Sequence, residues 1–154
     1  METTALTKRT KWLALLSLAG AVVSLYLTYL HFTPEASTIC QLGEAFDCDK
    51  VNKSVYSTFF GIPVAIMGSG YYIGMLIFSA LFSWNTKLFA KMDLKDLFQG
   101  IFLITFVGIA FSLYLTYHEA FTLKTYCIFC VTQQIIIIIM GMIVWDAYMK
   151  LKKA

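Results

Sequence analysis

The sequence contains few charged residues and almost no proline. Asp, Glu, Lys and Arg make up 14% of the 154 residues, where a soluble domain has about 25%. This scarcity of charge, with 59% hydrophobic residues, excludes an ordinary soluble domain. The net charge of +3 is too small to indicate a nucleic-acid surface. We therefore expect one membrane domain over residues 1–154.

Four stretches of the chain are long, apolar and almost free of charge. A helix needs ~20 apolar residues to cross a hydrocarbon layer of about 30 Å. The sequence therefore predicts an all-α membrane protein, a four-helix bundle. Its spans lie at about residues 12–32, 58–83, 97–117 and 126–146. The first stretch is longer than the apolar part of a signal peptide, so we expect it to be retained.

Basic residues predict the orientation of the bundle. Nine of the twelve Lys and Arg lie in the N-terminus, in the connector at 85–96 and in the C-terminus. The positive-inside rule then places both termini in the cytoplasm. An outer loop follows the first span, with a short interfacial helix at about 49–56. All four cysteines then fall on the side of the membrane away from the cytoplasm. That side is the thiol-oxidising one, whether the membrane is a bacterial plasma membrane or that of an endoplasmic reticulum.

The four cysteines form two pairs, Cys40-x7-Cys48 in the outer loop and Cys127-x-x-Cys130 at the start of the last span. A bridge across C-x-x-C closes a very small ring and constrains the unfolded chain little. Such pairs are more often redox-active or metal-binding. Structural zinc staples small modules that lack a core, so we expect no metal here. Redox chemistry is the favoured interpretation, with structural disulfides as the alternative.

The position of the second pair predicts an order of electron transfer. The start of a helix stabilises a thiolate, the nucleophile in disulfide exchange. Cys40 and Cys48 lie on a polar loop that a soluble thiol protein can reach. The reduced loop pair would attack the disulfide of Cys127 and Cys130. These would pass two electrons to an acceptor in the membrane, for which a quinone is suited.

These motifs together resemble the vitamin K epoxide reductase family. The resemblance rests on Cys40-x7-Cys48, on Ser54 and the Phe-Gly-Ile-Pro sequence at 60–63, and on Cys127-x-x-Cys130. It extends from about residue 11 to 150. Bacterial members of this family oxidise thioredoxin-like partners and reduce quinones. The resemblance implies the same activity here, with ubiquinone or menaquinone as the acceptor and a separate DsbA-like protein as the partner.

The resemblance also implies a role for each residue. Cys40 resembles the cysteine that partners attack, and Cys48 the shuttle that forms a mixed disulfide with Cys127. Cys130 resembles the thiol that faces the quinone, and Ser54 the serine beside that site. Gln134 stands where vertebrate members have a Tyr, so it is a candidate quinone contact. Tyr71 and Tyr72 either line a quinone pocket or pack between helices.

We therefore predict a disulfide-forming thiol:quinone oxidoreductase. One alternative is a vitamin K quinone or epoxide reductase of the endoplasmic reticulum. Another, of a different class, is a non-catalytic four-span protein with structural disulfides. An oxidase of the DsbB type is disfavoured, because its C-x-x-C lies in the first outer loop rather than after the third span.

Overall fold

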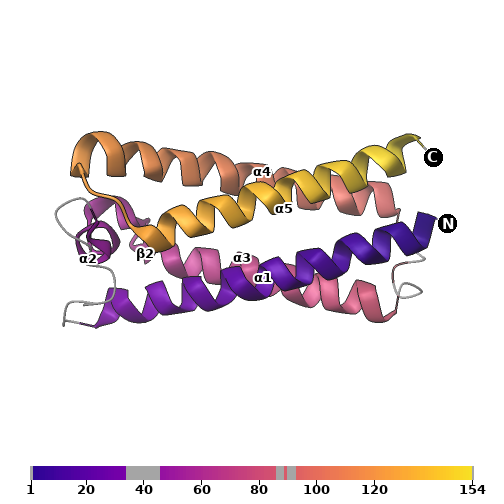
Figure 1. Ribbon diagram of the computed structural model, residues 1–154, viewed down its shortest axis with the longest axis horizontal. Helices are drawn as coiled ribbons and strands as arrows, with labels where there is room; N and C mark the ends of the chain where they lie inside the picture. Colours follow the sequence, from indigo (N-terminus) through magenta and orange to yellow (C-terminus); the bar gives the residue numbers. More distant parts are fainter. Residues whose placement is uncertain (1, 34–45, 86–88, 90–92, 154) are drawn as a thin grey trace.

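The protein is a bundle of four long helices (Figure 1). The computed structural model describes residues 2–33, 46–85, 89 and 93–153. The long helices are α1 (Glu2–Phe32), α3 (Val64–Trp84), α4 (Leu94–His118) and α5 (Ile128–Lys153). Each is long and apolar enough to cross a membrane. The predicted all-α membrane fold with four spans is confirmed.

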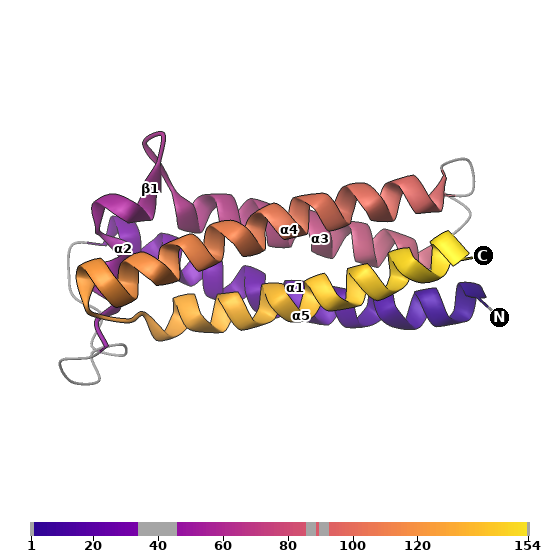
Figure 2. The same ribbon diagram turned by 90° about the horizontal axis from the view of Figure 1, so that it is seen from above.

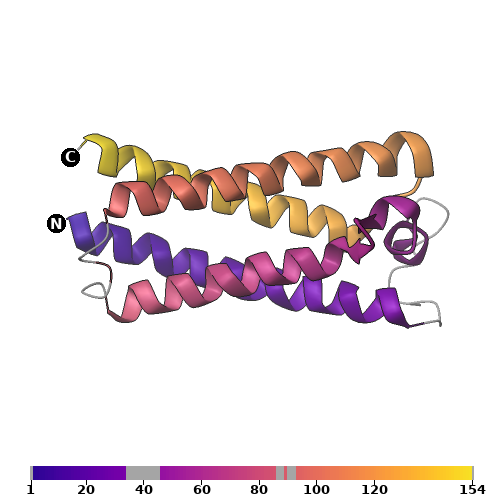
Figure 3. The ribbon, with the colours of Figure 1, turned by 180° about the vertical axis from the view of Figure 1, so that it is seen from behind.

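The helices run lengthwise in two antiparallel hairpins. The helix α1 packs against α3, and α4 against α5, while contacts between α1 and α5 join the hairpins. Both termini lie at one end of the bundle, and the short elements gather at the other, as Figure 3 shows from behind. An ion pair between Arg9 and Asp146 links α1 to α5. We call the opposite end, which carries α2, the cysteine end.

Apolar side chains cover both the inside and the outside of the bundle. Leu13, Met140 and Val144 are fully buried in the main core. On the outer face of α1, Leu15, Leu18 and Val22 are each at least half exposed. An apolar exterior of this kind suits a helix that is surrounded by lipid. The protein is therefore an integral membrane protein.

Glycine allows the two helices of the first hairpin to approach closely. A Cβ atom on Gly20 of α1 would overlap the ring of Tyr72 on α3. Tyr72 is buried, and its hydroxyl donates to the Gln133 carbonyl of α5, 3.2 Å away. Small residues at such crossings are typical of membrane bundles, where van der Waals packing drives association. Gly20 thus lets one aromatic side chain connect three helices.

Besides the turn η4 (Glu119–Leu123) that follows α4, the cysteine end contains the short elements between α1 and α3. They are α2 (Cys48–Asn52), the 3-10 helix η2 (Val55–Ser57), and the antiparallel strands β1 (Thr58–Phe59) and β2 (Ile62–Pro63). The predicted interfacial helix at 49–56 corresponds to α2 and η2. In Figure 2 the strands form a hairpin that projects from the bundle.

The hairpin changes where the second span begins. The sequence places its start near residue 58, but α3 begins at Val64. Phe60 and Gly61 take positive φ angles of 50° and 78° at the turn, a conformation that no helix continues through. Pro63 then precedes the first helical residue. The hairpin residues are as apolar as the helix that follows, so hydropathy alone does not separate them.

We expect Gly20→Val to destabilise the fold by ~1–3 kcal/mol, because the added methyl groups overlap a buried ring. The measurement is thermal unfolding in detergent. Gly70→Ala is the matched control, since a Cβ there meets no atom within 4 Å. Equal melting temperatures for Gly20→Val and the control would contradict the packing described here.

Candidate redox site

Backbone pairing holds the segment before α2 against the start of α5. Phe46 and Tyr126 form an isolated parallel bridge, and the Asp47 N–H donates to the Tyr126 carbonyl over 3.2 Å. The Asp47 carboxylate then accepts the Lys50 N–H at 3.0 Å and caps α2. A capping carboxylate of this kind fixes where a helix begins. The bridge therefore brings Cys48 and Cys127, which follow directly, to the same place.

Asn52 fastens the other end of α2 to α1. Its side-chain amide donates to the Leu27 carbonyl over 2.7 Å, and its own carbonyl accepts from the His31 ring at 2.7 Å. Asn52 is buried, so these partners satisfy polar groups that water does not reach. The short helix α2 is consequently held from both ends.

The sulfur atoms of Cys48 and Cys127 lie 3.0 Å apart. Both residues have no exposed surface. Cys48 is disulfide-bonded, whereas Cys127 and Cys130 are free thiols. Cys40 lies outside the described residues. A free thiol in contact with a disulfide sulfur is the arrangement from which thiol–disulfide exchange starts.

Cys127 stands at the N-cap position of α5. Its carbonyl accepts the Val131 N–H at 3.0 Å, and its sulfur accepts the Cys130 N–H at 3.4 Å. The hydrogen bond from the Cys130 side chain lowers the pKa of the Cys127 thiol, and backbone N–H groups add to this against the opposing effect of burial. Cys127 therefore ionises more readily than an ordinary cysteine, as a nucleophile in exchange requires.

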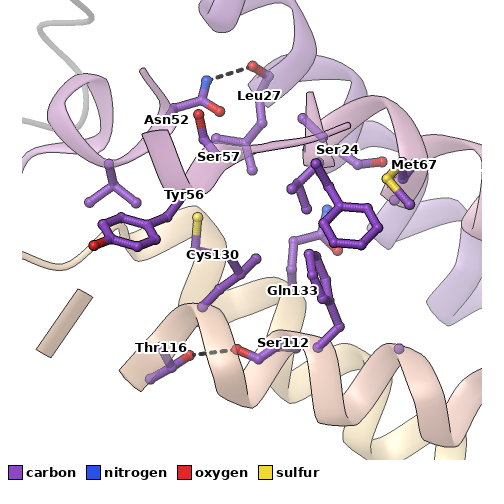
Figure 4. Close-up of a pocket in the computed structure, with 18 of the residues that line it drawn as sticks. Ser24, Leu27, Asn52, Tyr56, Ser57, Met67, Ser112, Thr116, Cys130 and Gln133 are labelled. Carbon is purple, nitrogen blue, oxygen red and sulfur yellow. Dashed lines mark hydrogen bonds between the residues drawn. The ribbon is translucent and has the colours of Figure 1, made fainter. Parts of the chain in front are cut away.

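A cavity of about 440 Å³ opens beside Cys130. It extends between α1, α3, α4 and α5 below the η2 segment, and Figure 4 shows Cys130, Gln133 and Tyr56 around it. Most of the lining is apolar, with side chains such as Leu27, Ile104 and Ile137. Its size and lining suit a small apolar ring with a few polar contacts.

The residues proposed from the sequence occupy different positions around this cavity. Ser54, Tyr71 and Tyr72 line it together with Cys130. The Tyr71 hydroxyl is 2.9 Å from Thr105 Oγ1, so both tyrosines also have polar partners in the bundle. Gln134 is not among the lining residues; its Oε1 accepts a hydrogen bond from Thr116 on α4, which does line the cavity.

Gln133 and Glu119 are among the polar residues of the cavity that were not expected from the sequence. Gln133 donates from Nε2 to the Gly20 carbonyl at 2.9 Å, while its buried Oε1 has no partner among the described residues. Glu119 is 2% exposed and accepts the Cys127 N–H at 3.2 Å. Spacing marks both Gln133 and Gln134 as neighbours of Cys130 on one helix face, three and four residues on, and does not choose between them. No comparable pattern marks Glu119.

Within the described part of the chain, no group of three or more His, Cys, Asp or Glu side chains could hold a metal ion. The arrangement is that of a thiol relay. One sulfur contact joins Cys48 to Cys127, and Cys130 of the same C-x-x-C motif borders the cavity.

Residues 11–145 match the vitamin K epoxide reductase family. The chain belongs to this family. It is also 29% identical over 125 residues to vitamin K epoxide reductase complex subunit 1 of Rattus norvegicus, covering 76% of each chain. The family resemblance drawn from the cysteine motifs is thereby confirmed.

Membership of the vitamin K epoxide reductase family makes the protein a membrane oxidoreductase of the vitamin K epoxide and quinone reductase kind. This family acts on quinone-type substrates. The cavity beside Cys130 has a fitting volume, and Gln133 is among its polar lining residues. A non-catalytic protein with two structural disulfides agrees neither with the family nor with the free thiols of Cys127 and Cys130.

The lowered pKa of Cys127 has a measurable consequence. In a protein with Cys40→Ala and Cys48→Ala, only Cys127 and Cys130 titrate as thiols. We expect thiolate ultraviolet absorbance to appear with a midpoint below the ordinary value of 9.0. Adding Cys130→Ala should move the midpoint upward, because the hydrogen bond from its side chain is lost.

Cys130→Ser is the matched control, since a hydroxyl can still donate to Cys127. A midpoint at or above 9.0, or one unchanged by Cys130→Ala, would contradict the N-cap thiolate.

Proposed function

We propose that the protein is a membrane thiol:quinone oxidoreductase that forms disulfides in a separate thioredoxin-like, DsbA-like protein. Electrons enter at Cys40 and Cys48, pass to Cys127 and Cys130, and leave on a membrane quinone, either ubiquinone or menaquinone. The 3.0 Å contact between the sulfurs of Cys48 and Cys127 carries this proposal. It joins the loop pair, which a soluble protein reaches, to the pair beside the cavity.

The relay runs by two exchanges. A partner dithiol reduces the Cys40–Cys48 disulfide and is itself oxidised. The freed Cys48 thiolate attacks Cys127 of the helix disulfide, Cys130 leaves as a thiolate, and Cys40 then resolves the mixed disulfide. The loop pair is oxidised again and the helix pair is reduced. A disulfide at Cys48 beside two free thiols on α5 is the state expected just after this transfer.

The helix dithiol next gives two electrons to the quinone and closes to a disulfide. Cys130 lines the cavity, so it faces the acceptor. Ser54 lies at the same cavity, where its hydroxyl supports a quinone oxygen. The Oε1 of Gln133, which has no partner among the described residues, suits the hydroxyl of a reduced quinone better than a quinone carbonyl, because an amide oxygen only accepts hydrogen bonds. Gln134, bonded to Thr116 on α4, affects the acceptor through the position of that helix.

The positive-inside rule supports an orientation with both termini in the cytoplasm. The cysteine end then lies on the extracytoplasmic face of a bacterial inner membrane. An oxidising compartment on that side agrees with the disulfide at Cys48 and gives the partner access to the loop.

A second candidate is reduction of vitamin K quinone or its epoxide in an endoplasmic reticulum. The similarity to the rat subunit named for vitamin K epoxide reductase favours it. Gln134 weighs against epoxide reduction, because vertebrate members resembling this chain have a Tyr there.

Trapping in cells distinguishes the candidates. Cys48→Ala leaves Cys40 unable to resolve a partner, so we expect a mixed disulfide with a thioredoxin-like protein on non-reducing gels. Cys40→Ala/Cys48→Ala is the matched control and should capture none. Purified wild-type protein should oxidise a reduced thioredoxin-like protein with ubiquinone or menaquinone. Failure to trap any partner, together with robust turnover of vitamin K epoxide, would overturn the proposal in favour of the second candidate.

A further inference from the structure

A buried carboxyl group lies against the thiols of Cys127 and Cys130 and has no basic partner among the described residues. Glu119 is 2% exposed, and neither of the ion pairs found among the described residues involves it. Its Oε2 accepts the Cys127 N–H at 3.2 Å, and its side chain hydrogen-bonds that of Cys130. Burying an acid costs free energy that these neutral donors only partly offset. An ionisable group kept at such a site indicates a function.

The backbone conformation after α4 positions this carboxyl group close to the start of α5. The π-helical turn η4 (Glu119–Leu123) extends α4, and Lys124 closes it with a positive φ of 52°. The Thr125 N–H returns to the Glu119 carbonyl over 3.1 Å. Single π-turns inside or at the end of α-helices are frequent at functional sites. The π-turn is wider than an α-helical turn, and the short loop after it brings the chain back to Cys127 beside Glu119.

Glu119 also borders the cavity. Among the described residues that line it, Glu119 is the one carboxylic acid, and Cys130 belongs to the same lining. The titratable groups facing it from other elements are Cys127 and Cys130. Cys48 lies behind Cys127 and is disulfide-bonded, so it does not titrate. On its own helix the neighbouring His118 ring is engaged elsewhere, stacked on Tyr56 and 3.1 Å from Thr122 Oγ1.

We propose that Glu119 is a catalytic residue that takes the proton of the Cys130 thiol and delivers a proton to the reduced quinone in the cavity. This inference rests on the proposed function. The Cys130 thiol has one hydrogen, and when it turns from the Cys127 sulfur to the carboxylate this side-chain hydrogen bond is the path for the first transfer. The position of Glu119 in the cavity lining provides the path for the second transfer, from the carboxyl group to the quinone.

The atoms and electrons balance. Cys127 releases its proton to water, and Cys130 releases its proton to Glu119. The two sulfurs form one S–S bond and give up two electrons, which the quinone takes up. One quinone oxygen receives the proton from Glu119 and the other receives a proton from water. Two protons are released and two are taken up, so Glu119 ends as the carboxylate with which it began.

The test uses full-length protein reduced at α5 and mixed with a short-chain ubiquinone. Glu119→Gln keeps an oxygen that accepts the Cys127 N–H but carries no proton for transfer. We expect its kcat to fall ~100-fold, in the range typical of general acid–base catalysis, with little change in KM. Its rate should rise steadily with pH, because hydroxide must replace the missing base, while the wild-type rate is nearly level around neutral pH.

Three controls sharpen the result. Glu119→Asp should restore much of the rate and the wild-type pH profile. Asp96→Asn removes an exposed acid at the other end of the same helix and should change neither. Exchange between Cys48 and Cys127, followed as the mixed disulfide in Cys40→Ala/Cys130→Ala protein, should survive Glu119→Gln.

Wild-type kcat and pH profile in Glu119→Gln would overturn the role of Glu119 alone. A wild-type protein that exchanges disulfides but reduces no quinone would instead overturn the proposed function. Infrared difference spectroscopy of wild-type protein with isotope-labelled Glu gives a second measurement that needs no variant. A Glu119 carboxyl band that never gains a proton, even transiently, while the reduced helix pair gives its electrons to the quinone would also contradict the proposal.

Discussion

The structure of the site depends on one contact between two sulfur atoms that are both excluded from solvent. Cys48 and Cys127 are far apart in the sequence, yet their sulfurs approach within 3.0 Å. Disulfide exchange needs the attacking and attacked sulfurs to meet in line, so small displacements slow it strongly. The surrounding elements can be understood by how they fix this contact.

Each interaction that holds the two cysteines in place involves only a short segment of the chain. The Phe46–Tyr126 bridge joins the two segments just before the cysteines, and Asn52 ties α2 back to α1. At α5 the helix begins immediately after Cys127, so the same N-cap geometry positions the sulfur and favours its thiolate. The long helices provide a rigid frame, and close packing such as that of Gly20 on Tyr72 keeps the frame narrow.

Features that extend over many residues, such as the four spans, were predicted from the sequence. Features that depend on the conformation of a single turn, such as the hairpin before α3, were not. Charge-free stretches predicted four spans, because membrane thickness sets their length. They could not reveal that Phe59, Phe60 and Ile62 belong to a hairpin rather than to α3, since these residues are as apolar as a span.

The same distinction applies to the site. Family resemblance led to Ser54, which the structure places at the cavity with Cys130. It also led to Gln134, whereas Gln133 lines the cavity. Neighbouring helical residues point about 100° apart, given 3.6 residues per turn, so the choice requires knowing where α5 begins. The sequence did not predict Glu119 as a site residue, because a single acid near a short polar loop is normally solvated. Its burial depends on the π-turn at which it lies.

The most direct test of the account is the spontaneous formation of the Cys48–Cys127 bond. In Cys40→Ala/Cys130→Ala protein, purified under reducing conditions and then oxidised mildly, only these two thiols remain. Mass spectrometry of the unreduced digest measures the linked peptide. We predict nearly complete linkage within each molecule, independent of protein concentration. Two thiols that stay free, or that link only between molecules, would contradict it.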